Sequence, residues 1–589
     1  MKIKHLFGLA VIAAMTASCH SNEDLGTAGS GTGTNETGVG YATFTINLPS
    51  TNGTRAGNPT YEQGTLDEYD VNDVTLLIFK KGDATKEGDF TFVEKADSGN
   101  MAPWKKDDTA NGITASATIT AKLTDVALTG TEYYALAILN NKTATAKAVK
   151  VKDPSKDQKY SDWNVAGNAV TANFTDNSKG FYMANAPKFT SGEPTTLVKI
   201  DKVYATKQKA ETNAATTIHV ERGLAKVTVA SFPTDKSPSG TKYTADKVDI
   251  TAWKLDVTNK STFPIHKTAG LTTNFTTIWS ASTEAAPSTG RFVDGTNTAF
   301  KRVHWGIDPN YSDNKYYDGD ATTSPAKTAL DCCKDAFNMI TNNKVDGAAG
   351  DANPQYCLEN TFDLNNMKQG QTTRVVFKAT YTPNGLNKGD TFYKIGNSTD
   401  LWNEENLKKQ IEAKASEVLS VAETEIIVDL DANNLNEAGT RLLTVDNVKI
   451  KDSSTAGSHA VSQDNINDIN AKLGLKDKTA TDPIVGIATY KSGESYYIAR
   501  IKHFGDLTPW TEGQETYGKN NDENNTKYLG RYGVLRNNWY ELSIGSVSGP
   551  GTPDVPTIKP TEPDDESYKY ISVSVKILSW AKRSQEVEL

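Results

Sequence analysis

A cysteine near the N-terminus has the surroundings that lipid attachment requires. Cys19 comes shortly after the apolar run Leu6–Met15, and Lys2 and Lys4 precede that run. An apolar run of this length behind basic residues is typical of an export signal and is too short to span a bilayer. Because a cysteine directly after small residues is where lipoprotein precursors are acylated and cut, we predict a palmitate or similar chain on Cys19. Ordinary cleavage near Ala17 is the alternative.

A second reactive position is an arginine in a loop of small residues. The segment Pro49–Pro59 contains Asn52-Gly-Thr-Arg-Ala-Gly-Asn58, with Arg55 as its single basic residue. Exposed tips made of small and polar residues are preferred sites of proteolytic cutting. A protease that cuts after arginine would therefore release the chain up to Arg55 and leave Ala56 as the new N-terminus.

Catalytic, metal and nucleotide motifs are incomplete. The seven histidines are too far apart in sequence to form a helical zinc pair. Gly513–Lys519 has the spacing of a phosphate-binding loop, but Asn520 stands where Ser or Thr would bind magnesium. Asp429 and Asp431 begin like a calcium loop, but Thr440 replaces the bidentate glutamate, which leaves only an irregular calcium site open. We expect no enzyme, no cofactor and no metal.

Length and charge narrow the class of protein. The chain has 589 residues, which suggests two to four domains, and its formal net charge is −9. A negative net charge gives no electrostatic footprint for nucleic acid. A hydrophobic fraction of 37% together with 44 glycines favours strands and turns over packed helices.

The cysteines beyond the signal region are too few for a disulfide scaffold. Cys332, Cys333 and Cys357 are an odd number in a long chain. The stretch Ala326–Ile340 has the apolar spacing of a helix, with Cys333 on its apolar stripe. We expect Cys333 to be a buried free thiol, and a bridge to Cys357 is the alternative.

The residues before Arg55 form a strand pattern. In Tyr41–Leu48 four apolar residues alternate with polar ones, which is the period of a half-buried strand. These residues are Ala42, Phe44, Ile46 and Leu48.

The C-terminus repeats this pattern behind a proline-rich segment. Residues 549–566 contain five of the 21 prolines and predict an extended spacer. The strand that follows again has four apolar residues at period two, namely Ile571, Val573, Val575 and Ile577. Such a strand can fold back on its own domain or add to another molecule.

The two matching strands suggest a mechanism. After a cut at Arg55 the first strand could leave a groove with four apolar pockets, and the C-terminal strand of a neighbour could fill it. Each subunit would then accept at one end and donate at the other, and a head-to-tail contact of this kind generates a filament. The alternative is an ordinary loop at Arg55 and a last strand that belongs to its own domain.

Between these ends the pattern is mostly β. Strands are predicted at 73–79, 113–123, 133–139, 181–183, 217–230, 248–257, 373–380, 425–429, 496–501 and 540–544, with helices at 405–419 and 462–473. The apolar-poor segment 207–215 predicts a domain boundary near residue 214.

Several segments resemble the fimbrillin family of surface lipoproteins, the protease-activated type V pilins, and among them the shaft subunits of minor fimbriae. They are Val71–Phe79, Gly180–Ala186, Val220–Val227, Tyr356–Thr361 and Arg531–Tyr540. The acidic residues shortly after Cys19 also resemble a signal for transport to the cell surface.

The resemblance implies an all-β fold of two transthyretin-like antiparallel β-sandwich domains with a few inserted helices. It also implies an arginine-specific protease, strand exchange with copies of itself, anchor and tip subunits as partners, and passage from a lipid-anchored outer-membrane precursor to an extracellular fimbrium. The expected organisation is a signal peptide (1–19), a flexible tether (20–38), a removed strand (39–55), two sandwiches (56–214 and 215–548), a spacer (549–566) and a donor strand (567–589).

A second hypothesis is a monomeric surface lipoprotein that binds glycans through its β-sandwiches. Trp510 and Trp539 are its candidate sugar-binding side chains.

Overall fold

The computed structural model describes most of the chain from residue 39 onward. It describes residues 39–47, 68, 71–100, 116–141, 149–171, 180–189, 192–271, 301–451, 461–479, 484–503, 529–564 and 571–579. Only the backbone is described for residues 97–100, 116, 170–171, 301–302 and 571–579. All of these residues belong to the unit 38–589. No helix among them is long and apolar enough to cross a membrane.

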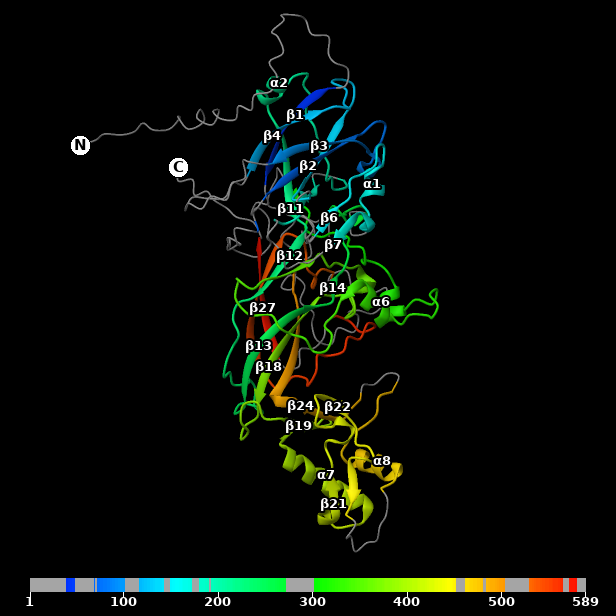
Figure 1. The fold of residues 1–589 in the computed structure, drawn as a ribbon, viewed down its shortest axis with the longest axis vertical. Coiled ribbons are helices and arrows are strands. Elements are labelled where there is room, and N and C mark those ends of the chain that lie inside the picture. Colours follow the sequence, from blue (N-terminus) through cyan, green and yellow to red (C-terminus); the bar gives the residue numbers. More distant parts are fainter. Residues whose placement is uncertain are drawn as a thin grey trace, which may run out of the picture. The chain divides into compact units, whose positions relative to one another are not determined.

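The first β-sandwich is a single sheet that curls back on itself (Figure 1). Its strand order is β3-β2-β5-β8-β11-β1-β4, with β10 beside β5. The strands are β1 (Gly40–Asn47), β2 (Asp73–Lys80), β3 (Thr91–Asn100), β4 (Ser116–Leu123), β5 (Tyr133–Leu139), β8 (Met183–Asn185), β10 (Val198–Lys199) and β11 (Thr216–Arg222). Apolar side chains from β1 and β4 meet those of β2 and β5 in one core cluster.

Side chains along β2 and β5 alternate between the two faces of this sheet, and those on the other face form a second core. Leu77 and Phe79 of β2 join the short helix α1 (Tyr160–Trp163), where Trp163 is fully buried. Phe79 meets Tyr160 edge to face at 5.6 Å between ring centroids. The sheet is therefore covered on both faces.

The second β-sandwich consists of two facing sheets. One has the order β17-β12-β26-β27 and the other the order β13-β18-β25. Tyr540 and Leu542 of the first sheet share a core cluster with Trp253 and Phe377 of the second. The strands are β12 (Leu224–Val229), β17 (Gln355–Leu358), β26 (Asn538–Val547), β27 (Ile571–Ser579), β13 (Lys247–Asp256), β18 (Arg374–Thr382) and β25 (Glu494–Arg500).

An inserted lobe between β18 and β25 has its own core. Helix α7 begins after Asn403, whose side chain accepts from the Asn406 amide, and buries Leu407, Ile411 and Ala415. Helix α8 begins with a capping box at Ser462. The lobe comprises α7 (Glu404–Leu419), α8 (Gln463–Lys472), β19 (Phe392–Ile395), β20 (Leu401–Trp402), β21 (Ile426–Val428), β22 (Gly439–Arg441), β23 (Val448–Ile450) and β24 (Ile487–Tyr490).

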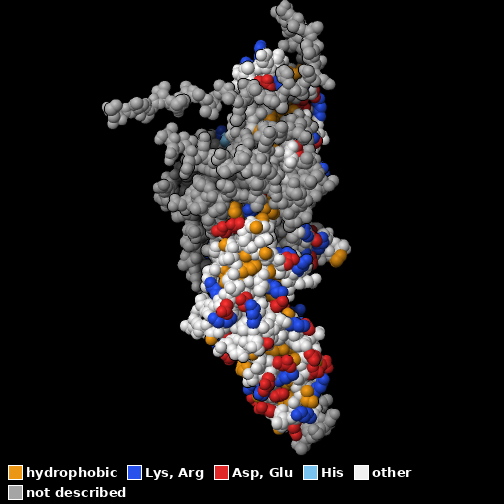
Figure 2. All heavy atoms as spheres, turned by 60° about the vertical axis from the view of Figure 1, so that its left-hand side comes forward, with side chains coloured by type: hydrophobic (Ala, Val, Ile, Leu, Met, Phe, Trp, Pro, Cys, Tyr) orange, Lys and Arg blue, Asp and Glu red, His pale blue; other side chains and the backbone are white. Residues whose placement is uncertain are grey.

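The remaining elements are short. They are β6 (Val149–Val151), β7 (Ala169–Thr171), β9 (Lys188–Phe189), β14 (Thr258–Asn259), β15 (Lys301–Arg302), β16 (Phe337–Asn338), α2 (Lys207–Glu211), α5 (Lys315–Asp318) and α6 (Ala329–Ala336). Acidic and basic side chains are interspersed over the described surface of the face shown in Figure 2.

The structure confirms the predicted all-β fold of sandwiches with few helices, and adds two parallel pairs, β1–β11 and β12–β26. The domain boundaries stay a prediction: β11 lies in the first sandwich, and β12, which follows it directly, lies in the second. The predicted helix at 326–340 is shorter, because Phe337 is already extended and pairs with β14. Cys332, Cys333 and Cys357 are buried free thiols.

Candidate functional site

The strand predicted to leave, β1, lies between two neighbours. It pairs antiparallel with β4 along its whole length, from Gly40 opposite Leu123 to Asn47 opposite Ser116. On its other side it pairs in parallel with the start of β11. Among the described strands, β4 has no other partner than β1. A chain without β1 would therefore present unpaired backbone groups on two strands, with a slot between them.

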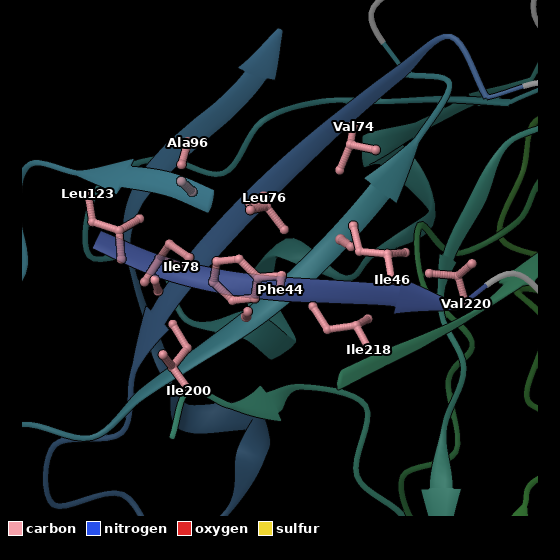
Figure 3. Packing of buried hydrophobic residues seen from close by; sticks show 14 of the residues in the cluster. Phe44, Ile46, Val74, Leu76, Ile78, Ala96, Leu123, Ile200, Ile218 and Val220 are labelled. Carbon is pink, nitrogen blue, oxygen red and sulfur yellow. The ribbon is translucent and has the colours of Figure 1, made fainter. Parts of the chain in front are cut away.

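One face of β1 is part of the core of the first sandwich. Ala42, Phe44 and Ile46 are 1%, 0% and 0% exposed, as the alternating pattern predicts. Figure 3 shows Phe44 and Ile46 pointing into the cluster formed by side chains of β2 and β11 and their neighbours. Burial of each large apolar side chain of this kind contributes about 1.5–3 kcal/mol. The pockets that hold these side chains are the apolar floor of the slot.

The opposite face of β1 carries a row of hydroxyls that match hydroxyls on β4. The Oγ1 atoms of Thr43 and Thr120 lie 2.9 Å apart, and those of Thr45 and Thr118 lie 3.0 Å apart. Thr43 is 7% exposed, whereas Thr45 is partly exposed. The sequence pattern alone predicts only that these positions are polar.

The N-terminal end of β1 is closely fitted. Tyr41 exchanges backbone hydrogen bonds with Tyr204, at 2.7 and 2.8 Å. A Cβ atom on Gly40 would lie 2.3 Å from a methyl carbon of Val203, so only glycine fits there without movement. At the other end, Asn47 pairs with His219, whose pKa is lowered by burial and then by the charge of Lys188.

The predicted donor strand is β27, and it is docked on its own chain. It forms the edge of a sheet of the second sandwich, antiparallel to β26. Its four predicted donor residues Ile571, Val573, Val575 and Ile577 pair with Val547, Ile544, Leu542 and Tyr540, respectively. The backbone thus places β27 beside residues that belong to the core of the second sandwich.

The proline-rich segment before β27 is bound to the second sandwich rather than free. Arg374 donates from Nη2 to the carbonyl of Pro556 at 2.6 Å, and Thr372 donates to the Asp564 carboxylate at 2.8 Å. Ile558 is buried. The expected spacer is therefore fixed along 549–564 while β27 is docked on its own chain.

A buried ion pair lies downstream of Arg55 and was not predicted. Glu68 and Lys226 are 2.8 Å apart, with both side chains nearly inaccessible. Tyr356 donates to the same carboxylate at 2.8 Å, and the Arg222 guanidinium donates to the Glu68 carbonyl. The Lys226 ammonium lies 3.7 Å from the centroid of Trp539. This cluster holds Glu68 against β11, β12 and β17.

Arg222 and Lys226 of this cluster belong to Val220–Val227, one of the segments that resemble the fimbrillin family. Their physical role is therefore to bind Glu68. Sequence reasoning found the motif but not its partner, because a single glutamate in a turn-rich segment carries no signal of burial.

Other predicted positions have mixed outcomes. Five of the predicted positions lie outside the described residues, so their roles stay predictions. They are Cys19, Leu48, Arg55, Ala56 and Trp510. The phosphate-loop-like stretch at 513–519 lies outside them too. Within the part of the chain that is described, no cluster of three or more histidine, cysteine or acidic side chains could hold a metal ion. Trp539 is 3% exposed, so it is not an accessible sugar-binding platform.

Comparison with known proteins finds a family match for the C-terminal part of the chain. Residues 488–586 match the sequence model described as major fimbrial subunit protein type IV, fimbrillin, C-terminal. The match includes β25, β26 and β27. The match confirms the predicted resemblance to the fimbrillin family in this part of the chain. No curated protein matches the chain.

Several solved structures align with most of this chain at low sequence identity. A putative cell adhesion protein of Parabacteroides distasonis is 10% identical, covers 92% of this chain and 98% of its own, and has a TM-score of 0.37. A fimbrilin (FimA) of Porphyromonas gingivalis is 10% identical, with 92% and 99% covered and a TM-score of 0.30. The tip fimbrial protein Mfa3 of the same species is 10% identical, with 92% and 100% covered and a TM-score of 0.26. None of these TM-scores reaches 0.5, so the likenesses do not define a role.

Proposed function

We propose that this chain is a structural, non-enzymatic pilus subunit that assembles by strand exchange. A protease cuts after Arg55, β1 leaves, and the C-terminal strand of a neighbouring copy takes its place. The single observation that supports this proposal most is the position of β1. It is an internal strand with a buried apolar face. Arg55 lies in the sequence between β1 and β2, so a cut after Arg55 would break the covalent link of β1 to the rest of the subunit.

Loss of β1 without replacement would be costly. Ala42, Phe44 and Ile46 would leave the core, at about 1.5–3 kcal/mol each for the two large side chains, and the facing edges of β4 and β11 would lose their backbone partner. The cut subunit therefore needs a strand with apolar residues at period two. Residues 571–577 of another copy have that pattern.

The donor gains neighbours by moving. On its own chain β27 is an edge strand with β26 as its strand neighbour, whereas the slot offers β4 on one side and β11 on the other. An added strand receives backbone hydrogen bonds from each neighbour, so the exchange is favourable once β1 has left. The intact precursor is blocked because β1 occupies the slot.

The remaining parts of the proposal concern the cell. Acylation of Cys19 would hold the precursor at the outer membrane, and the cut after Arg55 would free the subunit for assembly into an extracellular fimbrium that serves adhesion. Its partners would be copies of itself, anchor and tip subunits, and an arginine-specific protease. A shaft position in the fimbria follows from having both a slot and a donor.

The test uses residues 20–589 treated with limiting trypsin. We expect Ala56 as the new N-terminus and a ladder of multimers in unheated detergent gels. Arg55→Ala should give neither, whereas Arg55→Lys keeps the trypsin site and should give both. A subunit that is cut at Arg55 but stays monomeric would overturn the proposal and favour the anchored glycan-binding alternative.

A further inference from the structure

We infer that the folded subunit hides its arginines and exposes lysines instead, so that an arginine-specific protease can cut after Arg55 without cutting the described parts of the two sandwiches. This inference rests on the proposed cut after Arg55 and concerns what protects the rest of the chain from the same enzyme. It gives the distribution of arginine and lysine over the fold the role of confining the cut. A protease that also accepts lysine would not be confined in this way.

The arginines that follow Arg55 are unusually buried. Ten of the 63 basic residues are arginines, and the side chains of six of the ten are described. Five of these six are at most 8% exposed, namely Arg222, Arg374, Arg500, Arg531 and Arg536. In folded proteins arginine is mostly exposed and is rarely buried unless it is paired. Burial is therefore the rule among these arginines, where exposure would be usual.

Buried guanidinium groups of this set are bound by groups of the folded chain. The Arg222 side chain donates to the Glu68 carbonyl at 3.1 Å, and the Arg374 side chain donates to the Asp256 carboxylate at 2.9 Å. An arginine-specific protease must take the arginine side chain into its own pocket, so these contacts have to break before the chain can be cut. Cleavage at such a position requires local unfolding.

Arg441 is the partly exposed member of the six, and its backbone is held in a strand. It lies at the end of β22 and pairs with Ile487 of β24. Its guanidinium donates to the carbonyls of Glu437 and Ala438 at 2.8 and 3.2 Å. A Cβ atom on Gly486 would lie 2.4 Å from the Arg441 carbonyl oxygen, so the backbone here is closely covered. The peptide bond after Arg441 is therefore out of reach while β22 stays paired.

Lysines have the opposite distribution. Among the side chains that the structure describes, Lys226 and Lys368 are the only buried lysines. Lys156 lies in a turn between β6 and α1 with its side chain 69% exposed, and Lys388 lies in a turn between β18 and β19 with its side chain 64% exposed. Exposed turns of polar residues are where proteases cut folded proteins most readily. The fold thus has accessible turns, and the basic residues in them are lysines.

Charge alone does not account for this division. Arginine is better suited than lysine to buried pairs, which explains why arginines can be buried. It does not explain why the exposed turns lack arginine, because arginine there would carry the same charge. Arginine at position 388 could also keep the ion pair with Asp249, which lies 3.0 Å from the Lys388 ammonium. What arginine would add at an exposed turn is a site for the protease.

The test is limited digestion of 20–589 with an arginine-specific protease, read by the intact masses of the products. The chain carries lysine in place of the three arginines whose side chains are not described, by the substitutions Arg291→Lys, Arg302→Lys and Arg583→Lys. We expect the cut after Arg55, and cuts at the six described arginines at least about a hundredfold slower. At 1.4 kcal/mol for each factor of ten, this ratio corresponds to an opening free energy of about 3 kcal/mol.

Matched variants separate residue type from access. Lys156→Arg and Lys388→Arg keep the charge of an exposed turn and introduce an arginine there. The arginine-specific protease should cut each variant at the new arginine within the time that it needs for Arg55. A lysine-specific protease should cut the unchanged turns at the same two positions.

Two results would overturn the inference while leaving strand exchange intact. One is a native chain cut at any of the six described arginines as fast as after Arg55. The other is resistance of both Lys156→Arg and Lys388→Arg at the new arginine, because the turns and not the residue type would then protect the subunit. A chain that is cut only after Arg55 but stays monomeric would support the inference and overturn the proposed function.

Discussion

Phe44→Ala separates the stability of the precursor from that of the fibre. Phe44 is fully buried in the core of the first sandwich, and truncation of such a side chain costs about 3–5 kcal/mol. The uncut chain should therefore lose this much free energy of unfolding in urea. The mature subunit begins at Ala56 in our proposal and does not contain residue 44. Fibres from the variant should then dissociate at the same temperature as wild-type fibres.

The rate of assembly gives a second readout. Weaker docking of β1 makes its release easier, and each 1.4 kcal/mol corresponds to a factor of ten. If release precedes donor entry, a loss of about 3 kcal/mol speeds assembly by about a hundredfold.

Leu76→Ala is the matched control for Phe44→Ala. Leu76 lies in the same cluster and is also fully buried, but it remains in the mature subunit. It should weaken both the precursor and the fibre, by about 2–5 kcal/mol in the precursor. Fibres of the Phe44→Ala variant that melt as early as those of Leu76→Ala would refute the removal of β1.

Three further predictions follow from single contacts. Burial raises the pKa of the Cys333 and Cys357 thiols to about 12, so both should react slowly with a thiol reagent at pH 8 and promptly in denaturant; fast reaction of the native chain would contradict their burial. Glu68→Gln leaves the Lys226 charge buried and unpaired, which should cost about 3–5 kcal/mol in urea unfolding, and Lys226→Met in the same chain should restore part of it. Gly40→Val cannot fit beside its neighbour, so β1 should become sensitive to proteases in the precursor while mature fibres are unchanged.

Periodicity predicted the strands well where one face is buried. The alternation in Tyr41–Leu48 predicted the buried face of β1, and β5 begins and ends where its pattern predicted. The helices predicted at 405–419 and 462–473 match α7 and α8 to within one residue at each end. These features are local, because each depends on neighbours within a few residues.

Long-range partners could not be predicted in the same way. Helix α7 has a clear apolar stripe, but the stripe does not reveal that α7 packs within an inserted lobe. The Glu68–Lys226 pair joins residues far apart in the chain, and Glu68 has no local pattern. The proline-rich segment predicted an extended spacer, and its contacts with Arg374 and Thr372 depend on groups that only the folded sandwich brings together.

In the candidate site, too, local features could be predicted from the sequence and long-range contacts could not. The sequence indicated which strand carries the apolar row, whereas the hydroxyl contacts with Thr118 and Thr120 depend on the pairing of β1 with β4.

The central claim is that each subunit accepts through one site and donates through another, and two complementary variants test it directly. Arg55→Ala keeps β1 in its slot, so it can donate but not accept. A chain cut at Arg55 and lacking 567–589 can accept but not donate. With trypsin inhibited, the mixture should give a dimer and nothing larger, while each variant alone stays monomeric. No dimer in the mixture, or a ladder from either variant alone, would contradict strand exchange.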